Sequence, residues 1–157
     1  MRYCADTSAL LRLYLATKDA AVIERFLTDN AKVISVSELS RVEVINVLLR
    51  ARDARLADEF ERDLAEGRRL RLESVDWPDT FQQAESLARR FSSTLRPGAH
   101  DLVLVAAAVA MGATWFLSFD QQSHQRALAA AAGLRVWPPL SKEEKGLFRL
   151  ASTPAAS

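Results

Sequence analysis

Short apolar runs alternate with longer amphipathic stretches along the chain, and this alternation constrains the fold more than any other feature of the sequence. The runs are rich in β-branched and aromatic residues and nearly continuous in hydrophobicity, which is typical of strands buried in a parallel sheet. Neighbouring parallel strands need a crossover, which a helix supplies. We therefore expect an α/β sandwich whose central, mostly parallel sheet has about five strands flanked by helices. The predicted strands are residues 2–5, 32–37, 71–76, 114–120 and 134–138.

The stretches between these strands have the apolar spacing of helices. Pro78 is suited to a helix start, and Gly112 and Gly133 are suited to helix ends. After the last strand we expect one helical turn and then a frayed end. The predicted helices are residues 8–16, 19–30, 37–54, 55–70, 78–94, 99–111 and 121–132.

The composition is that of a globular protein, because 49% of the 157 residues are hydrophobic and 26% are charged. The length predicts a single domain, residues 1–140, followed by a C-terminal tail, residues 141–157. The net charge of +1 gives no overall basic field that would indicate nucleic acid as a partner. Cys4 is the only cysteine, so an internal disulfide and a thiolate metal cluster are excluded. We expect its thiol to be a small buried hydrophobe.

The chain lacks the patterns of membrane and export segments. Its start meets Asp6 before any apolar stretch of useful length, unlike a signal peptide. Its longest apolar run, residues 102–113, is shorter than the roughly 18 residues that would span a membrane. We therefore expect a soluble cytoplasmic protein that does not associate with membranes.

Three acidic residues stand where predicted strands end or where the next helix begins. Asp6 directly follows the first strand, and Asp120 ends the fourth. Asp101 opens the helix that leads into that fourth strand. A helix that precedes a parallel strand begins at the edge where the previous strand ended, which is the carboxyl edge. Because ligand sites of such sheets lie at that edge, we expect these three carboxylates to be close together.

A fourth acid, Glu43, lies in the second turn of the helix after the second strand, and Asn46 lies three residues further on. Both interrupt an apolar helix and could face a polar cleft at the same edge. Carboxylates that gather raise one another's pKa unless a cation is present, and oxygen ligands suit Mg²⁺ and Mn²⁺. Four such acids therefore indicate a metal centre that activates water for phosphoryl chemistry. Each acid alone could instead cap a helix or lie on a helix surface.

Four stretches of the chain resemble motifs of PIN-domain ribonucleases, in the branch of VapC-type toxins from bacterial toxin–antitoxin pairs. The resemblance extends from about Tyr3 to Trp137 and includes "ADTSAL", "SELSRVEVINVL", "HDLVLVAAAVAMGA" and "FLSFDQQ". It implies a PIN-like three-layer sandwich and a ribonuclease that uses Mg²⁺ or Mn²⁺. The residues that match the catalytic and metal positions are Asp6, Glu43, Asp101 and Asp120. The matching supporting positions are Ser8, Asn46 and Ser118, where Ser118 keeps the hydroxyl of the usual threonine.

The resemblance also implies partners. RNA would lie along the carboxylate edge, near the candidate cations Arg12, Arg41, Arg50 and Arg96, each of which is alternatively an ordinary solvated charge. Tyr14 and Phe119 could stack on bases or belong to the core. A cognate antitoxin would cover the groove. A homodimer is also implied, and Leu11, Tyr14 and Leu15 could contact the second copy or pack in the core.

Other classes fit less well. Haloacid-dehalogenase-type phosphatases need a second acid two residues after the first, where this chain has Ser8. HD-type phosphohydrolases need a histidine before the His100–Asp101 pair, and receiver domains need an acidic pair at the end of the first strand; both features are lacking. Two alternatives remain open: a PIN-fold module that binds RNA or a protein without cleavage, and an RNA-maturation nuclease with no antitoxin.

Overall fold

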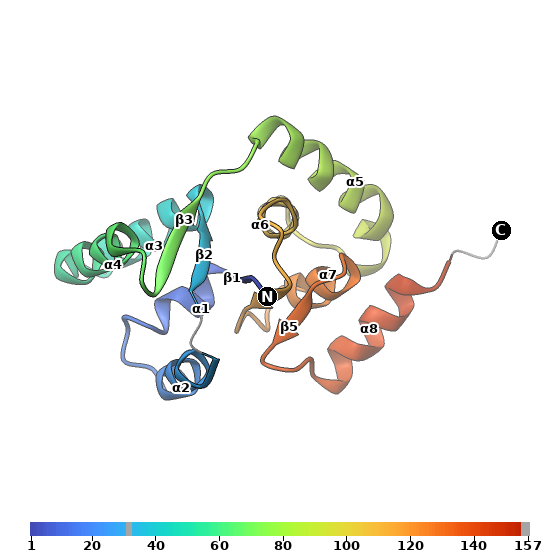
Figure 1. The fold of residues 1–157 in the computed structure, drawn as a ribbon. Coiled ribbons are helices and arrows are strands. Elements are labelled where there is room, and N and C mark those ends of the chain that lie inside the picture. The colour runs from blue at the N-terminus through green and yellow to red at the C-terminus, as the bar shows by residue number, and fades with distance from the viewer. Residues whose placement is uncertain (31–32, 155–157) are drawn as a thin grey trace.

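The structure is a computed structural model that describes residues 1–30 and 33–154 (Figure 1). Its strands form one sheet in the order β3-β2-β1-β4-β5, and every neighbouring pair is parallel. The prediction of a parallel sheet of about five strands flanked by helices is confirmed. The strands are β1 (Tyr3–Ala5), β2 (Ile34–Ser37), β3 (Leu70–Glu73), β4 (Trp115–Leu117) and β5 (Arg135–Trp137).

Helices connect the strands and cover both faces of the sheet (Figure 1). Several begin with a side-chain cap that the sequence offers, such as Ser37, whose hydroxyl accepts a hydrogen bond from the N–H of Ser40. The helices are α1 (Thr7–Leu11), α2 (Ala20–Asn30), α3 (Glu38–Arg50), α4 (Ala54–Glu66), α5 (Trp77–Leu95), α6 (Ala99–Ala110), α7 (Gln125–Ala131) and α8 (Lys142–Ser152).

Some elements are shorter than predicted. The strand predicted over 114–120 ends at Leu117, and in the turn that follows the Asp120 carboxylate accepts hydrogen bonds from the N–H groups of Gln122 and Ser123. The helix predicted over 8–16 ends at Leu11, where the N–H of Arg12 bonds to the carbonyl of Ala9. Lys32, at the start of the predicted second strand, lies outside the described residues.

The expectation of a single helical turn after residue 140 is wrong. Helix α8 has 11 residues and begins with a capping box, in which Ser141 and Glu144 each bond to the other's backbone N–H. Its Leu147 and Ala151 pack against buried residues of the core. A C-terminal segment that carries an amphipathic face and a cap is therefore held by tertiary packing rather than frayed.

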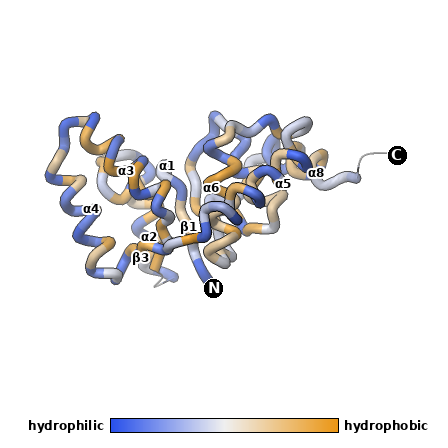
Figure 2. The backbone as a smooth tube through the Cα atoms, turned by 90° about the horizontal axis from the view of Figure 1, so that it is seen from above, coloured by the Kyte–Doolittle hydropathy of each residue, from blue (hydrophilic) through white to orange (hydrophobic). Residues whose placement is uncertain are grey.

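Two hydrophobic clusters lie on opposite faces of the sheet. Successive residues of β1 point to opposite sides, so that Tyr3 and Ala5 join the cluster beneath α1 to α4, whereas Cys4 joins the one beneath α5 to α7. Burial raises the pKa of the Cys4 thiol to about 12, as expected of a buried small hydrophobe. Figure 2 shows α6 as a largely hydrophobic helix in the middle of the molecule, between the more polar α4 and α8.

The chain order creates a switch point in the sheet. From β1 the chain proceeds to β2 and β3 on one side and returns to β4 and β5 on the other. The carboxyl ends of β1 and β4 are therefore neighbours, with Ala5 opposite Leu117. A crevice for a ligand is expected outside these two ends. In the described residues, no helix has the length and apolar character needed to cross a bilayer.

Candidate functional site

The four predicted carboxylates line one pocket of about 290 Å³ outside the carboxyl ends of β1 and β4. Asp6 follows β1, Glu43 lies on α3, Asp101 lies in the first turn of α6, and Asp120 follows β4. The side chains of Thr7, Ser8, His100 and Gln125 complete its polar lining. We refer to this cavity, lined by these eight polar residues and three apolar ones, as the acidic pocket.

Asp6 is the most buried of the four acids, with 3% of its surface exposed. Its Oδ1 accepts hydrogen bonds from Ser8 Oγ at 2.6 Å and from the N–H of Ala9 at 2.9 Å, and its Oδ2 accepts one from Ser118 Oγ at 2.7 Å. Burial raises the pKa of Asp6 to about 6 although these hydrogen bonds oppose the shift, and repulsion from Asp120 adds to it. Asp6 therefore caps α1 and lines the acidic pocket at the same time.

Two serines connect Asp6 to the loop after β4. Ser118 Oγ accepts a hydrogen bond from the N–H of Asp120 at 3.2 Å while it donates to Asp6. Ser8 Oγ likewise accepts one from the N–H of Phe119 at 2.9 Å while it donates to the other oxygen of Asp6. These hydroxyls hold segments that are far apart in the sequence in one arrangement around the Asp6 carboxylate.

Asp120 is held in its ionised form. Its Oδ2 accepts a hydrogen bond from Ser123 Oγ at 2.8 Å, in addition to the backbone bonds from Gln122 and Ser123. Partial burial alone would raise the pKa of Asp120, but these hydrogen bonds and the charge of Arg126 outweigh it, so that the pKa lies below its usual range. The carboxyl groups of Asp6 and Asp120 therefore differ in proton affinity at near-neutral pH.

Asp101 and Glu43 have their own donors. Asp101 Oδ2 accepts a hydrogen bond from the N–H of Gly98 at 3.0 Å, and its Oδ1 accepts one from Gln125 Nε2 at 3.1 Å. Glu43 Oε2 accepts one from Thr7 Oγ1 and lies 3.2 Å from His100 Nε2. Every acid of the pocket thus has a fixed orientation set by neighbouring donors.

The predicted supporting residue Asn46 is not part of this arrangement. It is exposed on α3, and the residue of that helix that lines the pocket beside Glu43 is Val47. The pocket therefore faces the i, i+4 row of the helix surface rather than the i, i+3 row that the pairing of Glu43 with Asn46 assumed.

The acidic pocket fits a divalent cation in donor type and charge. Within the described part of the chain, four carboxylates line it and neither lysine nor arginine does. Carboxylates that share a site without a counter-charge repel one another, and hard oxygen donors suit Mg²⁺ and Mn²⁺. Across residues 1–30 and 33–154, however, no three His, Cys, Asp or Glu side chains are spaced so that they could ligate one ion together. The carboxylates are turned instead to the hydroxyl, amide and imidazole donors described above.

Comparison with known protein families agrees with this architecture. Residues 3–130 match the PIN domain, with β1, β4 and all four acids inside the matched region. The chain belongs to the PIN domain family. The resemblance noted from the sequence motifs, and the PIN-like fold that it implied, are thereby confirmed.

Two solved structures have the same fold as this PIN domain. One is VapC20 of Mycobacterium tuberculosis, described as a sarcin–ricin loop cleaving toxin, with a TM-score of 0.64 and 20% identity over 84% of this chain and 95% of that one. The other is FitAcB from Neisseria gonorrhoeae, with a TM-score of 0.59 and 13% identity over 87% of this chain and 97% of that one. A search of curated protein sequences found no significant match.

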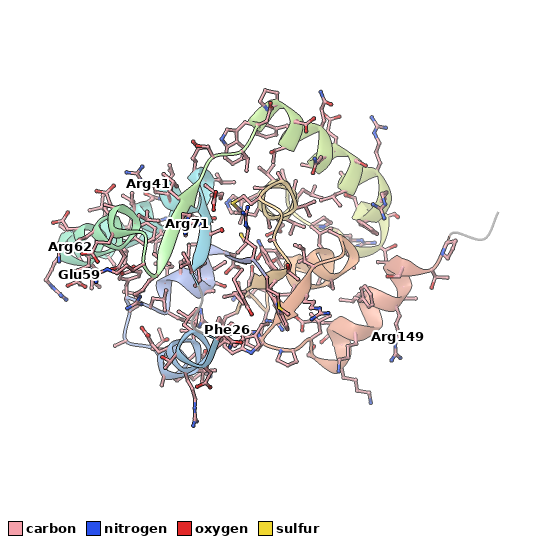
Figure 3. All side chains as sticks on the ribbon, viewed as in Figure 1. Phe26, Arg41, Glu59, Arg62, Arg71 and Arg149 are labelled. Carbon is pink, nitrogen blue, oxygen red and sulfur yellow. The ribbon has the colours of Figure 1, made fainter. Side chains whose placement is uncertain are left out.

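Of the four candidate RNA-binding arginines, only Arg12 lies beside the acidic pocket of this PIN domain. Its Nη1 donates to the carbonyl oxygen of Ser8 at 2.7 Å. Arg41 pairs with Glu61 of α4 at 2.8 Å, on the α3–α4 side of the molecule (Figure 3), and Arg50 and Arg96 are exposed at the ends of α3 and α5. The sequence could not separate these arginines, because all four follow or lie within helices.

The structure also places the residues that were predicted either to stack on bases or contact a second copy, or to pack in the core. Tyr14 packs edge-on against Phe60 and donates a hydrogen bond to Asp63 at 2.5 Å, and Leu11 and Leu15 pack against the same cluster. All three are partly buried, and Leu11 also lines the acidic pocket. Phe119 is half-buried near the acidic pocket, with its edge against Trp137.

Three side chains that organise this site are not among the site residues predicted from the sequence. Thr7 bonds to Glu43, Gln125 bonds to Asp101, and Ser123 bonds to Asp120. Thr7 and Gln125 are buried polar residues, a class that is usually hydrogen-bonded. The signal that could have found them is their position: Thr7 directly follows Asp6, and Ser123 and Gln125 follow Asp120 within five residues.

Proposed function

We propose that this PIN domain is a metal-dependent endoribonuclease that hydrolyses RNA phosphodiester bonds. The observation that carries the proposal is the acidic pocket itself: four carboxylates from four segments, held in place by donors, with no lysine or arginine among the described residues that line it. A site of that charge attracts a divalent cation and, through it, a phosphate.

Asp6, Glu43, Asp101 and Asp120 would hold the metal, Mg²⁺ or Mn²⁺. The ion would polarise a phosphate oxygen of the substrate and make a water molecule more acidic. Ser8 and Ser118 keep both oxygens of Asp6 fixed, and Gln125 keeps Asp101 facing the pocket. The low pKa of Asp120 leaves it ionised near neutral pH, where its carboxylate would accept a hydrogen bond from water and orient it.

The family and its neighbours support the same class of reaction. One structural neighbour is described as a toxin that cleaves the sarcin–ricin loop, which favours an RNA substrate and a toxin role here. We infer that the protein is the toxin of a type II toxin–antitoxin pair, acts in the cytoplasm, forms a homodimer and is neutralised by a cognate antitoxin. The alternatives are an RNA-maturation nuclease without an antitoxin and a binding module that does not cleave.

Cleavage of a mixed RNA pool that includes tRNA tests the reaction. We expect the purified protein to give discrete products with Mg²⁺ or Mn²⁺ and none with EDTA. Asp6→Ala and Asp101→Asn should both abolish cleavage, and the circular dichroism spectrum of Asp101→Asn should be unchanged. The control is Asp58→Asn, which alters an exposed acid of α4 and should cleave as the unaltered protein does. Cleavage by Asp101→Asn at the original rate would overturn the site assignment. If the protein neither cleaves RNA nor binds the metal, the non-cleaving module is favoured.

Induced expression in bacteria tests the toxin role separately. We expect growth arrest from the unaltered protein and normal growth from Asp101→Asn at equal protein levels. RNA cleavage in vitro without growth arrest would favour the RNA-maturation nuclease over the toxin.

A further inference from the structure

A second and larger cavity, of about 580 Å³, adjoins the acidic pocket. The two share Ser8 and Asp120 in their walls, so that a molecule bound in one touches the boundary of the other. We call this second cavity the flanking pocket; its distinctive lining residues are Arg12, Lys18 and Phe119. Its volume lies in the range of small-molecule sites, roughly 300–1,000 Å³.

A flat cationic surface is built into its wall. The guanidinium of Arg12 lies over the ring of Phe119, 4.3 Å from the ring centroid, and is fixed there by its bonds to the Ser8 carbonyl and to Asp19 Oδ2 at 3.4 Å. Phe119 is in turn held edge-on by Trp137 at 5.7 Å. Guanidinium planes and aromatic rings are the surfaces on which unpaired RNA bases stack.

The position of α2 supports this wall. Phe26 of α2 stacks on Trp137 of β5 with 4.2 Å between ring centroids, and Figure 3 shows Phe26 between the two elements. The contact fixes α2 beside the end of β5, so that the segment with Lys18 and Asp19, which leads into α2, borders the pocket. The flanking pocket is therefore part of the packed fold.

The charges in this pocket favour an anion at one end. Asp19 pairs with Arg12 and offsets its charge, whereas Lys18 is exposed and has no ion pair within the described ranges. A phosphate bound near Lys18 would form an ion pair with its ammonium group, which has no such partner within the described residues. Gln121 and Gln122, also in the lining, present exposed amides that can both donate to and accept from the edges of a base.

We infer that the flanking pocket binds one unpaired nucleotide next to the bond to be cleaved, with its base on the Arg12–Phe119 stack and its phosphate at Lys18. This inference rests on the proposed RNA-cleaving function of the acidic pocket. It assigns the substrate as single-stranded at that nucleotide, because a base within a duplex is already stacked and cannot present its face to Arg12.

Single-turnover cleavage with an abasic substrate tests the stack. The shortest RNA that the protein cleaves is compared with versions that lack one base on either side of the cut, in the unaltered protein and in Arg12→Lys. We expect removal of one flanking base to slow the unaltered protein about tenfold. The same removal should have little further effect in Arg12→Lys, which keeps the charge and loses the plane. Equal effects of base removal in both proteins would overturn the stack.

Two further variants serve as a substitute and as a control in this test. Phe119→Leu should give the same loss of sensitivity to base removal and replaces Arg12→Lys if that protein does not fold. Arg89→Lys, at an exposed position of α5, should retain the full tenfold sensitivity.

Binding measurements separate this inference from the proposed function. The probe is a short fluorescent single-stranded RNA of mixed sequence, measured in EDTA, where no cleavage is expected. We expect Lys18→Gln to weaken binding and to reduce the salt dependence by about one charge, whereas Lys145→Gln on α8 should leave both unchanged. Binding of the duplex form should be weaker than that of the single strand. Equal binding by Lys18→Gln and Lys145→Gln would overturn the flanking pocket, whereas binding without cleavage in metal would overturn only the nuclease.

Discussion

At the residue scale, the buried carboxylate of Asp6 makes stability depend on pH. Because burial raises the pKa of Asp6 from 3.8 to about 6, the native protein binds more protons than the unfolded chain between these pH values. The free energy of unfolding should therefore fall as the pH rises through this window and be lower by a constant amount above it.

Asp6→Asn should remove this dependence. In EDTA, we expect the variant to gain stability relative to the unaltered protein on going from pH 4 to pH 8, by at most about 3 kcal/mol, because a shift of about two pKa units corresponds to that energy. Urea unfolding at the two pH values measures it. Asp58→Asn, an exposed acid on α4, is the control and should show no such gain. A difference between Asp6→Asn and the unaltered protein that is the same at both pH values would contradict the assignment.

Ser118 is the second residue on which the site depends, because its buried hydroxyl bonds both to Asp6 and to the backbone of Asp120. We expect Ser118→Ala to lower the free energy of unfolding by about 1–3 kcal/mol at pH 8 and to raise the pKa of Asp6 further. Urea unfolding and carboxyl titration by NMR measure the two effects. Ser93→Ala, exposed on α5, should produce neither. An unchanged pKa of Asp6 would show that the hydroxyl does not stabilise its charge.

At the element scale, the buried side chain of Arg126 joins α8 to the ends of two strands. It donates to the carbonyl oxygens of Ser118 after β4 and of Pro138 after β5, and its Nε lies 2.8 Å from Glu144 Oε1 of α8. Glu144 is thus the counter-charge of a guanidinium that supports the loop carrying Asp120. Helix α8 contributes to the site from outside it.

We therefore expect Glu144→Gln to destabilise the protein by about 1–3 kcal/mol near pH 7 and to speed hydrogen exchange in α8. Partial burial alone would raise the pKa of Glu144, but hydrogen bonds from Ser141 and Arg126 outweigh it and lower the pKa. The stabilisation is thus present above the unfolded pKa and is lost as the pH falls through the lower native value. Glu143→Gln, the exposed neighbouring position, is the matched control. Equal exchange rates in the two variants would contradict the role of the pair.

At the scale of the whole molecule, the boundary predicted between a domain at 1–140 and a tail at 141–157 remains a prediction. The packing of Leu147 and Ala151 against the core argues that α8 is integral to the domain. We expect a chain that ends at Leu140 to keep its sheet but to lose about 2 kcal/mol or more of unfolding free energy, because it exposes apolar surface and removes the counter-charge of Arg126. Circular dichroism and urea unfolding measure this. Unfolding of the shortened chain at the original urea concentration would support the predicted boundary instead.

The sequence-based prediction succeeded where the physical cause is local. The periodicity of apolar residues depends on the backbone repeat of each element, so the strands, most of the helices and the parallel sheet could be predicted. The order of strands and helices also placed Asp6, Asp101 and Asp120 at one edge, because parallel strands end on the same side. The alternation of elements was thus sufficient to predict the location of the candidate site.

Contacts between side chains that are far apart in the sequence could not be predicted in this way. The rotation of α3 about its axis, set by the burial of Val44 and Leu48, turns Glu43 and Val47 to the pocket and leaves Asn46 in solvent. The anchoring of α8 likewise depends on Arg126 reaching Glu144 across 18 residues of sequence. Neither the orientation of α3 nor the Arg126–Glu144 pair can be read from the sequence near these residues.

The sequence by itself determined the class of the fold and the edge where the acids gather, because both follow from periodicity and from the direction of parallel strands. Only the tertiary structure decided which donors hold each carboxylate, which of four similar arginines lies beside the site, and that a second pocket adjoins it. These depend on how whole elements rotate and pack against one another. That packing is set by the sum of many contacts in the two hydrophobic clusters rather than by any one stretch of the chain.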